Sequence, residues 1–539
     1  MELGKSIKLS TLSMTVFGFS LILSNVKMIS GGNILLVSTN SMASPSHYMA
    51  LSTLTGGLVS RKHNVTIVTN DIKGLTGFPN GTYSQALYFE ASYDPKEVAK
   101  VMDEMTQVLV FSPMGFIETM MKFTNFMKEM YNSCLDLWKD HKLLENLRTS
   151  HFDLVLVFPL SACDVLMSHY LDVPFVVILP SIRVPIFHEG FIGMPLPASF
   201  VPFDMFGTMT DEMNFWERLR NLASPLVAHI MGYQMTKDYY NIQVMHDIYP
   251  DRTIRELYSK ASLFLSHVSF GNDFPRPYTP NFVPIGGLVS QASKPLPKDM
   301  EEFVQGSGDS GVIIFTLGSA VKGLFKEEIA EIFARVFSKL PQRVMWRHDA
   351  KPPSSLAENT KIFKWLPQND LLGHPKTRLL IYHGGSNGVL ESICHGVPMV
   401  IIPLLGDQVT HAARVQKKGM GLMLDKGNIT EENLLSTIQE VLQNPMYRER
   451  AQHYSDIHHD LPMTPLERAV YWIEHVMKFG DQHLRPRSAD MDFIELYMID
   501  VIVFLIFVFS VGLYIDYLIL RKCFECCCGK FKRTKSKRE

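Results

Sequence analysis

Short apolar runs alternate with amphipathic segments in the first half of the chain. The runs read "NILLVST" (33–39), "NVTIVTND" (64–71), "FDLVLVF" (152–158) and "PFVVILP" (174–180). A segment with helical spacing, "HYMALSTLTGGLVSRKH", separates the first two runs, and another separates the last two. Strands that alternate with helices in this way predict a doubly wound α/β domain built on a parallel sheet.

The same alternation starts again after "VSQASKPLPKDM" (289–300), whose Ser, Pro and Lys content is typical of a linker. Beyond it, "GVIIFTLGS", "QRVMWRH", "TKIFKWLP", "TRLLIYHGG" and "PMVIIPL" predict strands, with one helix at about 327–340 and another that ends at Cys394. We therefore expect two Rossmann-like halves whose ligand-bearing loops face each other across a cleft. The length of 539 residues, 46% of them hydrophobic, is enough for two cores.

Both ends of the chain carry a longer apolar segment. At the N-terminus, Lys5 and Lys8 precede apolar residues 12–23, which predicts a cleaved signal peptide over residues 1–30. Near the C-terminus, residues 499–520 are apolar enough to span a bilayer as a helix. The tail after it, residues 521–539, has eight Lys and Arg against two Glu, which places the tail in the cytosol and the bulk of the chain in the lumen.

The basic tail also carries targeting and modification signals. Its last residues, "KSKRE", resemble a dilysine retrieval signal and predict the endoplasmic reticulum membrane. Four cysteines follow the span, where S-acylation is favoured over a metal site: Cys523, Cys526, Cys527 and Cys528. Three sequons in the lumenal part predict a glycoprotein, at Asn64, Asn80 and Asn428. The lumenal cysteines are too few for a disulfide-built fold.

Charge excludes one class of partner. The whole chain carries −2 and the tail +6, so the globular part carries about −8, which argues against a nucleic-acid surface. A stretch at 187–216 is rich in Pro, Met and Phe without a clear period. It is read either as a loop packed on the core or as an adaptable apolar lining for a lipophilic ligand.

The polar residues after two predicted strands carry the chemistry. "LLIY" is followed by His383, two glycines, Ser386 and Asn387 at the start of a helix, a pattern that can hold a diphosphate on backbone N–H groups. Glu391 lies one helical turn after Asn387 and can accept hydrogen bonds from a ribose diol.

Two further pairs complete this constellation. Asp407 and Gln408 follow the next strand and suit vicinal hydroxyls, while Trp365 and Gln368 offer a flat face and an amide to a base. A dinucleotide glycine fingerprint is absent after "NILLV", and so is a GxxxxGK loop. A ligand with a base, a ribose, a diphosphate and a polyol fits all of these positions, which points to a nucleotide sugar.

The segment "WLPQNDLLGHPKTRLLIYHGGSNGVLESICHGVPMVIIPLLGDQ" resembles the signature of the UDP-glycosyltransferases, which include UDP-glucuronosyltransferases and ceramide galactosyltransferase. The resemblance extends to "DFPRPYTPNFVPIGGL", "FTLGS" and "PLERAVYWIEHVMKFGDQHLRP" and covers nearly the whole chain. It implies a GT-B fold and inverting, metal-independent transfer of a hexose from a UDP-sugar to the hydroxyl of a small lipophilic acceptor. It implies no cofactor beyond the UDP-sugar co-substrate.

The resemblance also assigns regions and roles. The expected order is an acceptor-binding domain (31–288), a linker (289–300), a UDP-sugar-binding domain (301–462), helices that return to the N-terminal domain (463–490), the span and the tail. Trp365 and Gln368 would hold the uracil, and Glu391 the ribose. The remaining donor-binding residues would hold the diphosphate and then the sugar: Ser319, His383, Gly385, Ser386 and Asn387, followed by Asp407 and Gln408.

His47, in "SPSHYMA" at the start of the first helix, matches the family's catalytic base. A neutral imidazole there can take the acceptor's proton, and the helix dipole helps to keep it neutral. The family places an Asp where this chain has Phe158, and a phenyl ring cannot support an imidazolium. Asp164, six residues further on, is the candidate replacement. The alternative is a weak or silent relative that binds UDP-sugar or partners an active transferase.

The sugar is indicated by two positions. Asp407–Gln408 accompanies glucose or glucuronic acid in the family, whereas ceramide galactosyltransferase has Asp-His. Many glucuronate users carry an arginine about where His267 stands, which favours a neutral hexose such as glucose here. A NAD-linked enzyme ranks last, because neither half has its glycine pattern. The acceptor's identity and any homo- or hetero-oligomer are left open by the sequence.

Overall fold

The protein is described by a computed structural model, which covers residues 31–38, 45–70, 78–90, 92, 132, 134–159, 162–179, 193–203, 207–224, 254–318, 327–404 and 406–535. The predicted signal peptide, Ser319 and the final residues of the tail lie outside this part of the chain. The chain divides into two compact units, Met1–Arg485 and Pro486–Glu539.

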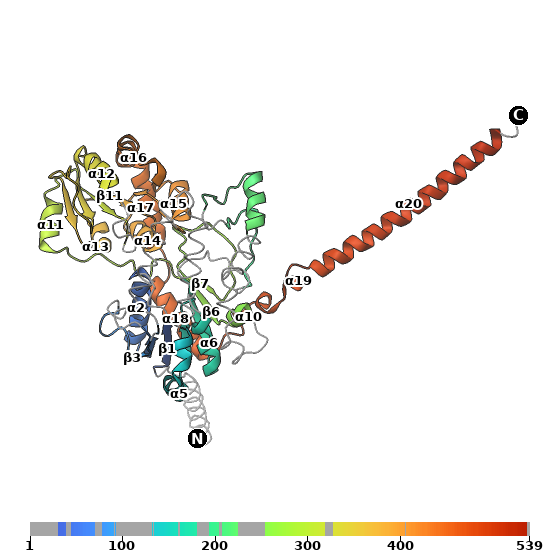
Figure 1. Cartoon of the computed structure of the whole chain (residues 1–539), viewed down its shortest axis with the longest axis horizontal. Coiled ribbons are helices and arrows are strands. Elements are labelled where there is room, and N and C mark those ends of the chain that lie inside the picture. The colour runs from blue at the N-terminus through green and yellow to red at the C-terminus, as the bar shows by residue number, and fades with distance from the viewer. Residues whose placement is uncertain are drawn as a thin grey trace, which may run out of the picture. The chain divides into compact units, whose positions relative to one another are not determined.

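The first unit begins with a parallel sheet of seven strands in the order β3-β2-β1-β4-β5-β6-β7 (Figure 1). Its strands are β1 (Asn33–Ser38), β2 (Asn64–Thr69), β3 (Gln85–Tyr88), β4 (Leu154–Val157), β5 (Phe175–Leu179), β6 (Leu263–Ser266) and β7 (Phe282–Pro284). Both faces of the sheet are buried, because Leu35 and Val37 enter one core while Ile34 and Leu36 enter the other. This explains why the strands read as continuous apolar runs instead of alternating ones.

Helices cover both faces of the first sheet. They are α2 (Pro45–Ser60), α5 (His141–Thr149), α6 (Ala162–Leu171), α10 (Ile254–Ser259) and, from far along the chain, α18 (Pro465–Phe479). Helix α18 packs beside α2, where Gly57 leaves room for Leu466. Glu474 of α18 pairs with Arg61 at 2.7 Å and contacts His63 at 3.2 Å, so the late helix is joined to the first sheet's layer by charge as well as by packing.

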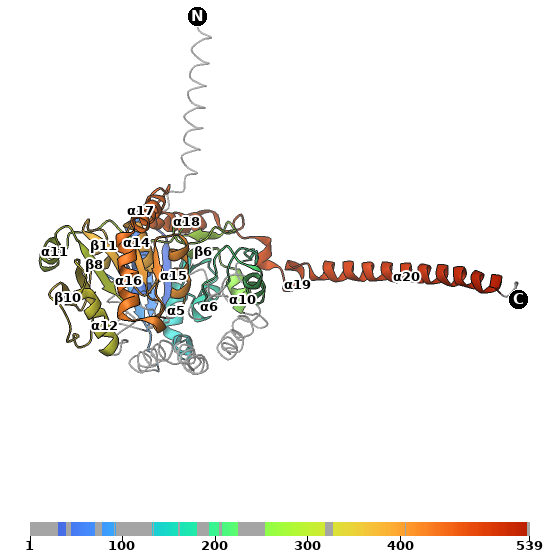
Figure 2. The same ribbon diagram turned by 90° about the horizontal axis from the view of Figure 1, so that it is seen from above.

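A second parallel sheet has six strands in the order β10-β9-β8-β11-β12-β13. Its strands are β8 (Val312–Thr316), β9 (Arg343–Arg347), β10 (Thr360–Phe363), β11 (Thr377–Tyr382), β12 (Met399–Ile401) and β13 (Gly421–Met423). The helices of this half are α11 (Lys298–Gln305), α12 (Glu327–Ser338), α13 (Gln368–Leu372), α14 (Ser386–Cys394), α15 (Gln408–Lys417), α16 (Glu431–Gln443) and α17 (Pro445–His459). Helices α12 and α16 share one apolar core with the sheet, and α11, α13, α14 and α15 share the other. Figures 1 and 2 show the positions of these helices.

Aromatic side chains fill the core under α12. Phe315 of β8 stacks on Phe333 at 4.5 Å between ring centroids and meets Trp346 of β9 at 5.3 Å. All three are essentially inaccessible to solvent. Large buried rings supply much of the hydrophobic free energy of such a core and keep β8 and β9 in a fixed position.

Each sheet reverses its strand order once, between β1 and β4 in the first and between β8 and β11 in the second. Loops leave in opposite directions at such a point, and the carboxyl ends of the strands there are where ligands bind in doubly wound folds. The topology confirms the predicted pair of Rossmann-like sheets. The predicted helix at 327–340 ends at Ser338, and the helix after the double glycine ends at Cys394 as expected.

The second unit consists of helical segments, among them a short 3-10 helix (Arg487–Asp490), α19 (Phe493–Leu496) and the long α20 (Ile499–Lys535). Within the described residues, Ile499–Cys526 of α20 is long and apolar enough to cross a membrane. Its 28 residues extend about 42 Å as a helix, more than the ~30 Å hydrocarbon core requires. The predicted segment 499–520 is therefore part of a longer helix.

Candidate active site

The double glycine after β11 shapes the start of α14. Gly384 has φ +93°, a conformation that glycine adopts without strain, and a Cβ there would lie 2.9 Å from the Cγ2 of Ile401. Gly385 precedes α14, and a Cβ on it would lie 2.7 Å from Nε2 of His383. The first N–H groups of a helix have no partner within the helix, so the α14 start presents donors where a phosphate can approach closely.

The turn after β8 lies against the same histidine. Gly318 has φ +79°, and a Cβ on it would lie 2.4 Å from Cε1 of His383. Arg347, at the end of β9, donates a hydrogen bond to the Gly318 carbonyl at 2.6 Å and so holds this turn. Neither residue was predicted. Gly318 lies within "FTLGS" just after β8, and Arg347 is the last residue of β9, so their place at the carboxyl ends of strands is the signal that could have identified them.

His383 is buried and neutral. Burial lowers its pKa to about 3; Asp407 opposes this effect, and the charges of His411 and Arg347 add to it. Its Nδ1 has no hydrogen-bond partner in the described part of the chain. A neutral ring with one N–H can donate a single hydrogen bond to a phosphate oxygen, which agrees with its predicted use.

Gln368, predicted to bind the uracil ring, and Glu391, predicted to bind the ribose, lie in contact with each other. Gln368, at the start of α13, donates to a carboxylate oxygen of Glu391 in α14 at 2.5 Å, so two positions 23 residues apart form one unit. Burial raises the pKa of Glu391 to about 7, against the lowering effect of the Gln368 hydrogen bond. Trp365 lies just before α13 and is 66% exposed, which leaves its ring available to a ligand.

Asp407 and Gln408 begin α15. The side-chain carbonyl of Gln408 accepts from the Leu404 backbone N–H at 2.8 Å, so the orientation of this amide is fixed from within its own turn. Asp407 is partly exposed, and its Oδ2 lies 3.4 Å from Nε2 of His411. Burial raises the pKa of Asp407, but the nearby His411 side chain, with smaller effects from His47 and Arg414, leaves it below the ordinary value. Asp407 is therefore ionised at neutral pH.

His47 lies in the first turn of α2, as expected, and its ring is next to Phe158 at the end of β4. The ring centroids are 5.2 Å apart and the planes are tilted by 49°. Burial lowers the pKa of His47 to about 4, and the charge of Asp407 opposes that shift. Burial is thus the main reason for the low pKa, and an electrostatic interaction links the candidate base of the first sheet to a donor residue of the second.

Asp164 lies in the first turn of α6 and is buried. Among the described residues, Nδ1 of His47 has no hydrogen-bond partner, so Asp164 does not bond that nitrogen here, and its catalytic role stays a prediction. His267, by contrast, is in electrostatic contact with His47, and burial together with that contact lowers its pKa to about 4. His267 is therefore uncharged at neutral pH.

Comparison with known proteins identifies the family. A family model described as "UDP-glucoronosyl and UDP-glucosyl transferase" matches residues 32–535. The chain belongs to this family. UDP-glucuronosyltransferase 2C1 of Oryctolagus cuniculus is 37% identical over 86% of this chain and 93% of the relative. UDP-glucuronosyltransferase 2A3 of Homo sapiens is 35% identical over 91% of this chain and 93% of the relative.

Solved structures support the fold of this UDP-glycosyltransferase. A UDP-glucosyltransferase from Polygonum tinctorium superposes with a TM-score of 0.57 and 16% identity, covering 83% of this chain and 99% of that one. The glycotransferase of kitacinnamycin gives a TM-score of 0.56 at 19% identity, over 83% and 99% of the two chains. The predicted GT-B fold is confirmed, and the protein is an enzyme that transfers a glycosyl group from a UDP-sugar. The homologues together with α20 make it a single-pass membrane protein.

Proposed function

We propose that this enzyme moves a hexose, with inversion, from a UDP-sugar to the hydroxyl of a small lipophilic acceptor, with His47 as the base. The observation that carries the proposal is that α15 contacts the first half through His411–Asn272 and Arg414–Asp273, which agrees with the effect of the Asp407 charge on His47. His47 belongs to the sheet expected to bind the acceptor and Asp407 to the sheet expected to bind the donor. Acceptor activation and sugar recognition thereby converge on one place.

The proposed reaction is a single displacement. The neutral His47 ring takes the proton of the acceptor hydroxyl while that oxygen forms a bond to the anomeric carbon and the bond from this carbon to UDP breaks. The leaving diphosphate keeps the electron pair and is stabilised by the N–H groups at the start of α14 and by a hydrogen bond from His383. Glu391 with Gln368 binds the nucleoside, and Asp407 and Gln408 bind the sugar hydroxyls.

The positive charge that forms on His47 needs a carboxylate to stabilise it. Phe158 touches His47 where the family has a carboxylate, and it cannot accept a hydrogen bond from the ring. Asp407 is the carboxylate whose charge acts on His47. We propose that Asp407 supplies the compensating charge in addition to its role toward the sugar, at the cost of a slower proton transfer than an adjacent Asp would allow.

For the sugar, we propose a neutral hexose, with glucose ahead of glucuronic acid and galactose. The neutral, buried His267 cannot balance a carboxylate, and it stands about where glucuronate users carry an arginine. This supports glucose even though the relatives compared above are named UDP-glucuronosyltransferases.

For the location, we propose the membrane of the endoplasmic reticulum with the two sheets in the lumen. Cys134 is disulfide-bonded, and such bonds persist in oxidising compartments. The basic tail after the span supports the same orientation.

The test is release of UDP by purified protein reconstituted in a bilayer. UDP-glucose, UDP-galactose, UDP-glucuronate and UDP-N-acetylglucosamine are offered in turn with a panel of phenols, sterols and ceramides. We expect acceptor-dependent release that is greatest with UDP-glucose and is lost in His47→Ala. The second candidate, a silent relative, is favoured by Phe158 alone; donor binding without acceptor-dependent release across the panel would establish it.

A further inference from the structure

Helix α15 carries two buried side chains that reach the other half of the first unit. His411 and Arg414 lie one and two turns after Asp407, and both are nearly inaccessible to solvent. Their partners are consecutive residues of the segment after β6, Asn272 and Asp273. Directly after Asp407, the proposed sugar-binding carboxylate, α15 therefore makes two contacts with the half that contains the first sheet.

The first contact defines the state of the His411 ring. The amide nitrogen of Asn272 lies 3.1 Å from Nδ1 of His411, and an amide nitrogen can only donate. Nδ1 of His411 is then the acceptor, so the ring carries its proton on Nε2. If the Asn272 amide were turned around, its oxygen would face Nδ1 and the ring would have to carry its proton there. Nε2 would then present a lone pair to the Asp407 carboxylate, which is repulsive. Both the amide and the carboxylate thus select the same tautomer.

The proton on Nε2 is directed at Asp407. The distance from Nε2 to Oδ2 of Asp407 is 3.4 Å, and Nε2 has no hydrogen-bond partner within the described part of the chain. His411 is only 4% exposed, so water does not readily replace the missing bond. Hydrogen bonds in an empty active site are often long and shorten when the substrate arrives.

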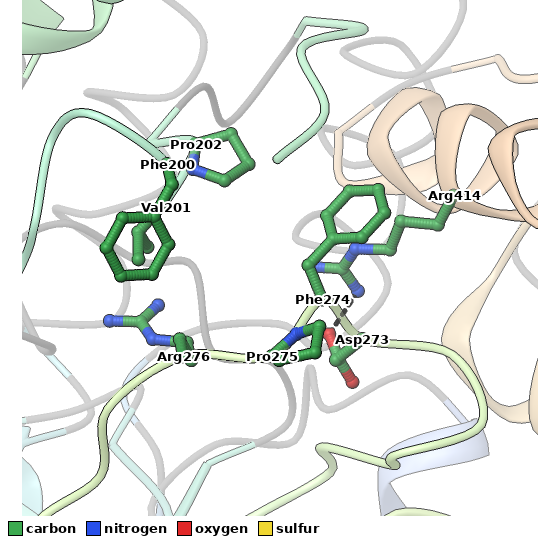
Figure 3. Close-up of a pocket in the computed structure, with 8 residues that line it drawn as sticks. All are labelled: Phe200, Val201, Pro202, Asp273, Phe274, Pro275, Arg276 and Arg414. Carbon is green, nitrogen blue, oxygen red and sulfur yellow. Dashed lines mark ion pairs between the residues drawn. The ribbon is translucent and has the colours of Figure 1, made fainter. Parts of the chain in front are cut away.

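The second contact holds the first in place. Arg414 forms a buried ion pair with Asp273, whose other oxygen accepts from the Ser269 backbone N–H at 2.9 Å. Figure 3 shows the Arg414 side chain extending toward Asp273 beside Phe274. Asn272, which is 1% exposed, is therefore fixed by its neighbour against α15.

We propose that His411 is a positioning residue for Asp407, with Asn272 selecting its tautomer from the other sheet. Its Nε2–H holds one carboxylate oxygen, which leaves the remaining lone pairs of Asp407 directed at the sugar hydroxyls. The inference rests on the proposed role of Asp407 in binding the sugar. It predicts that substitutions at His411 weaken binding of the sugar part of UDP-glucose and do not change the affinity for UDP.

The experiment measures dissociation constants for UDP-glucose and for UDP by calorimetry on the reconstituted full chain. UDP lacks the sugar, so the ratio of the two constants isolates the contact at Asp407. His411→Phe should raise the dissociation constant for UDP-glucose about tenfold, the size expected for the loss of one charge-assisted hydrogen bond. The dissociation constant for UDP should stay within about twofold of the wild-type value. His411→Gln, whose amide can donate from a similar position, should restore most of the loss. Asn272→Ala should give an intermediate loss.

Two further arms separate positioning from a general structural effect. In an Asp407→Asn background, His411→Phe should add little, because the partner that it positions is already altered. The control is His374→Gln, a histidine whose Nε2 lies 3.6 Å from a carboxylate oxygen of Glu301 and which has no proposed role toward the donor, so both constants should stay unchanged. Equal loss of UDP and UDP-glucose binding in His411→Phe, or no loss of either, would overturn the inference. Because these are binding constants, they stand whether or not the wild-type protein shows turnover, which tests the proposed function separately.

Discussion

Restoring a carboxylate beside His47 should make the base stronger by an amount that the structure allows to be calculated. The Phe158 ring centre is 5.2 Å from the imidazole centre, so Phe158→Asp would place a negative charge at about that distance. With an effective dielectric constant of about 20, a pair of unit charges at ~5 Å interacts by ~3 kcal/mol, or about two pKa units. The pKa of His47 would rise from about 4 to about 6.

The sign of this effect sets the expected pH profile. His47 must be neutral to accept a proton, so activity falls as pH drops through its pKa. In the wild-type protein, kcat/KM for the acceptor should stay constant down to about pH 5. In Phe158→Asp the acid limb should move to about pH 6, while kcat at pH 8 rises, because the imidazolium formed in the reaction is stabilised.

Phe158→Asn is the matched control, because it removes the same ring without adding a charge. Losing a buried Phe ring costs about 3–5 kcal/mol of stability in either variant, so both are compared after thermal unfolding has shown that they are folded at the assay temperature. An acid limb that stays in place in Phe158→Asp, or that moves equally in both variants, would refute the assignment of His47 as the base next to this position.

Other predictions test the remaining site residues. Asp164→Asn should leave kcat within about twofold of wild type in the UDP-release assay, because Asp164 does not bond Nδ1 of His47; a large loss would restore it as the replacement for the missing Asp. Glu391 has its pKa raised to about 7 by burial and is protonated below that value, so UDP affinity should increase from pH 6 to pH 8 as the carboxylate ionises and accepts the ribose hydroxyls. Glu391→Gln should abolish that pH dependence in calorimetry. Gly318→Ala should weaken UDP binding about tenfold or more, since its Cβ would meet the His383 ring at 2.4 Å, and unchanged binding would show that this turn does not shape the diphosphate site.

Much of the site could be predicted from the sequence because most of its residues lie in one continuous segment of the chain. One segment of the chain contains β11, α14 and the start of α15, and the functional residues directly follow strand ends. Local rules are sufficient there: apolar runs predict buried parallel strands, and glycine followed by a helix start predicts an anion site. Asp164 lies in the first turn of α6, and its distance from His47 depends on how α6 packs against the sheet.

The residues that were not predicted make contacts with residues far away in the sequence. Asn272 contacts His411, 139 positions further on, and Arg347 donates a hydrogen bond to Gly318, 29 positions before it and on the other side of α12 in the sequence. No periodicity connects such pairs, because the two halves of each contact are fixed by separate elements. Glu391 illustrates a related limit: its position was predicted, but its pKa follows from burial, which only the packed α14 determines.

By itself the sequence determined the two Rossmann-like halves, the membrane-spanning segment and the nucleotide-sugar motif, because each follows from hydrophobic periodicity or from polar groups within a few residues of one another. Only the tertiary structure decided that Phe158 packs against His47, that the charge of Asp407 acts on His47, and that Asn272 contacts His411. The first of these depends on how α2 packs against the first sheet, and the other two depend on how the two separately formed sheets come together. The free energy of that assembly is spread over many side chains, and no short stretch of the chain encodes it.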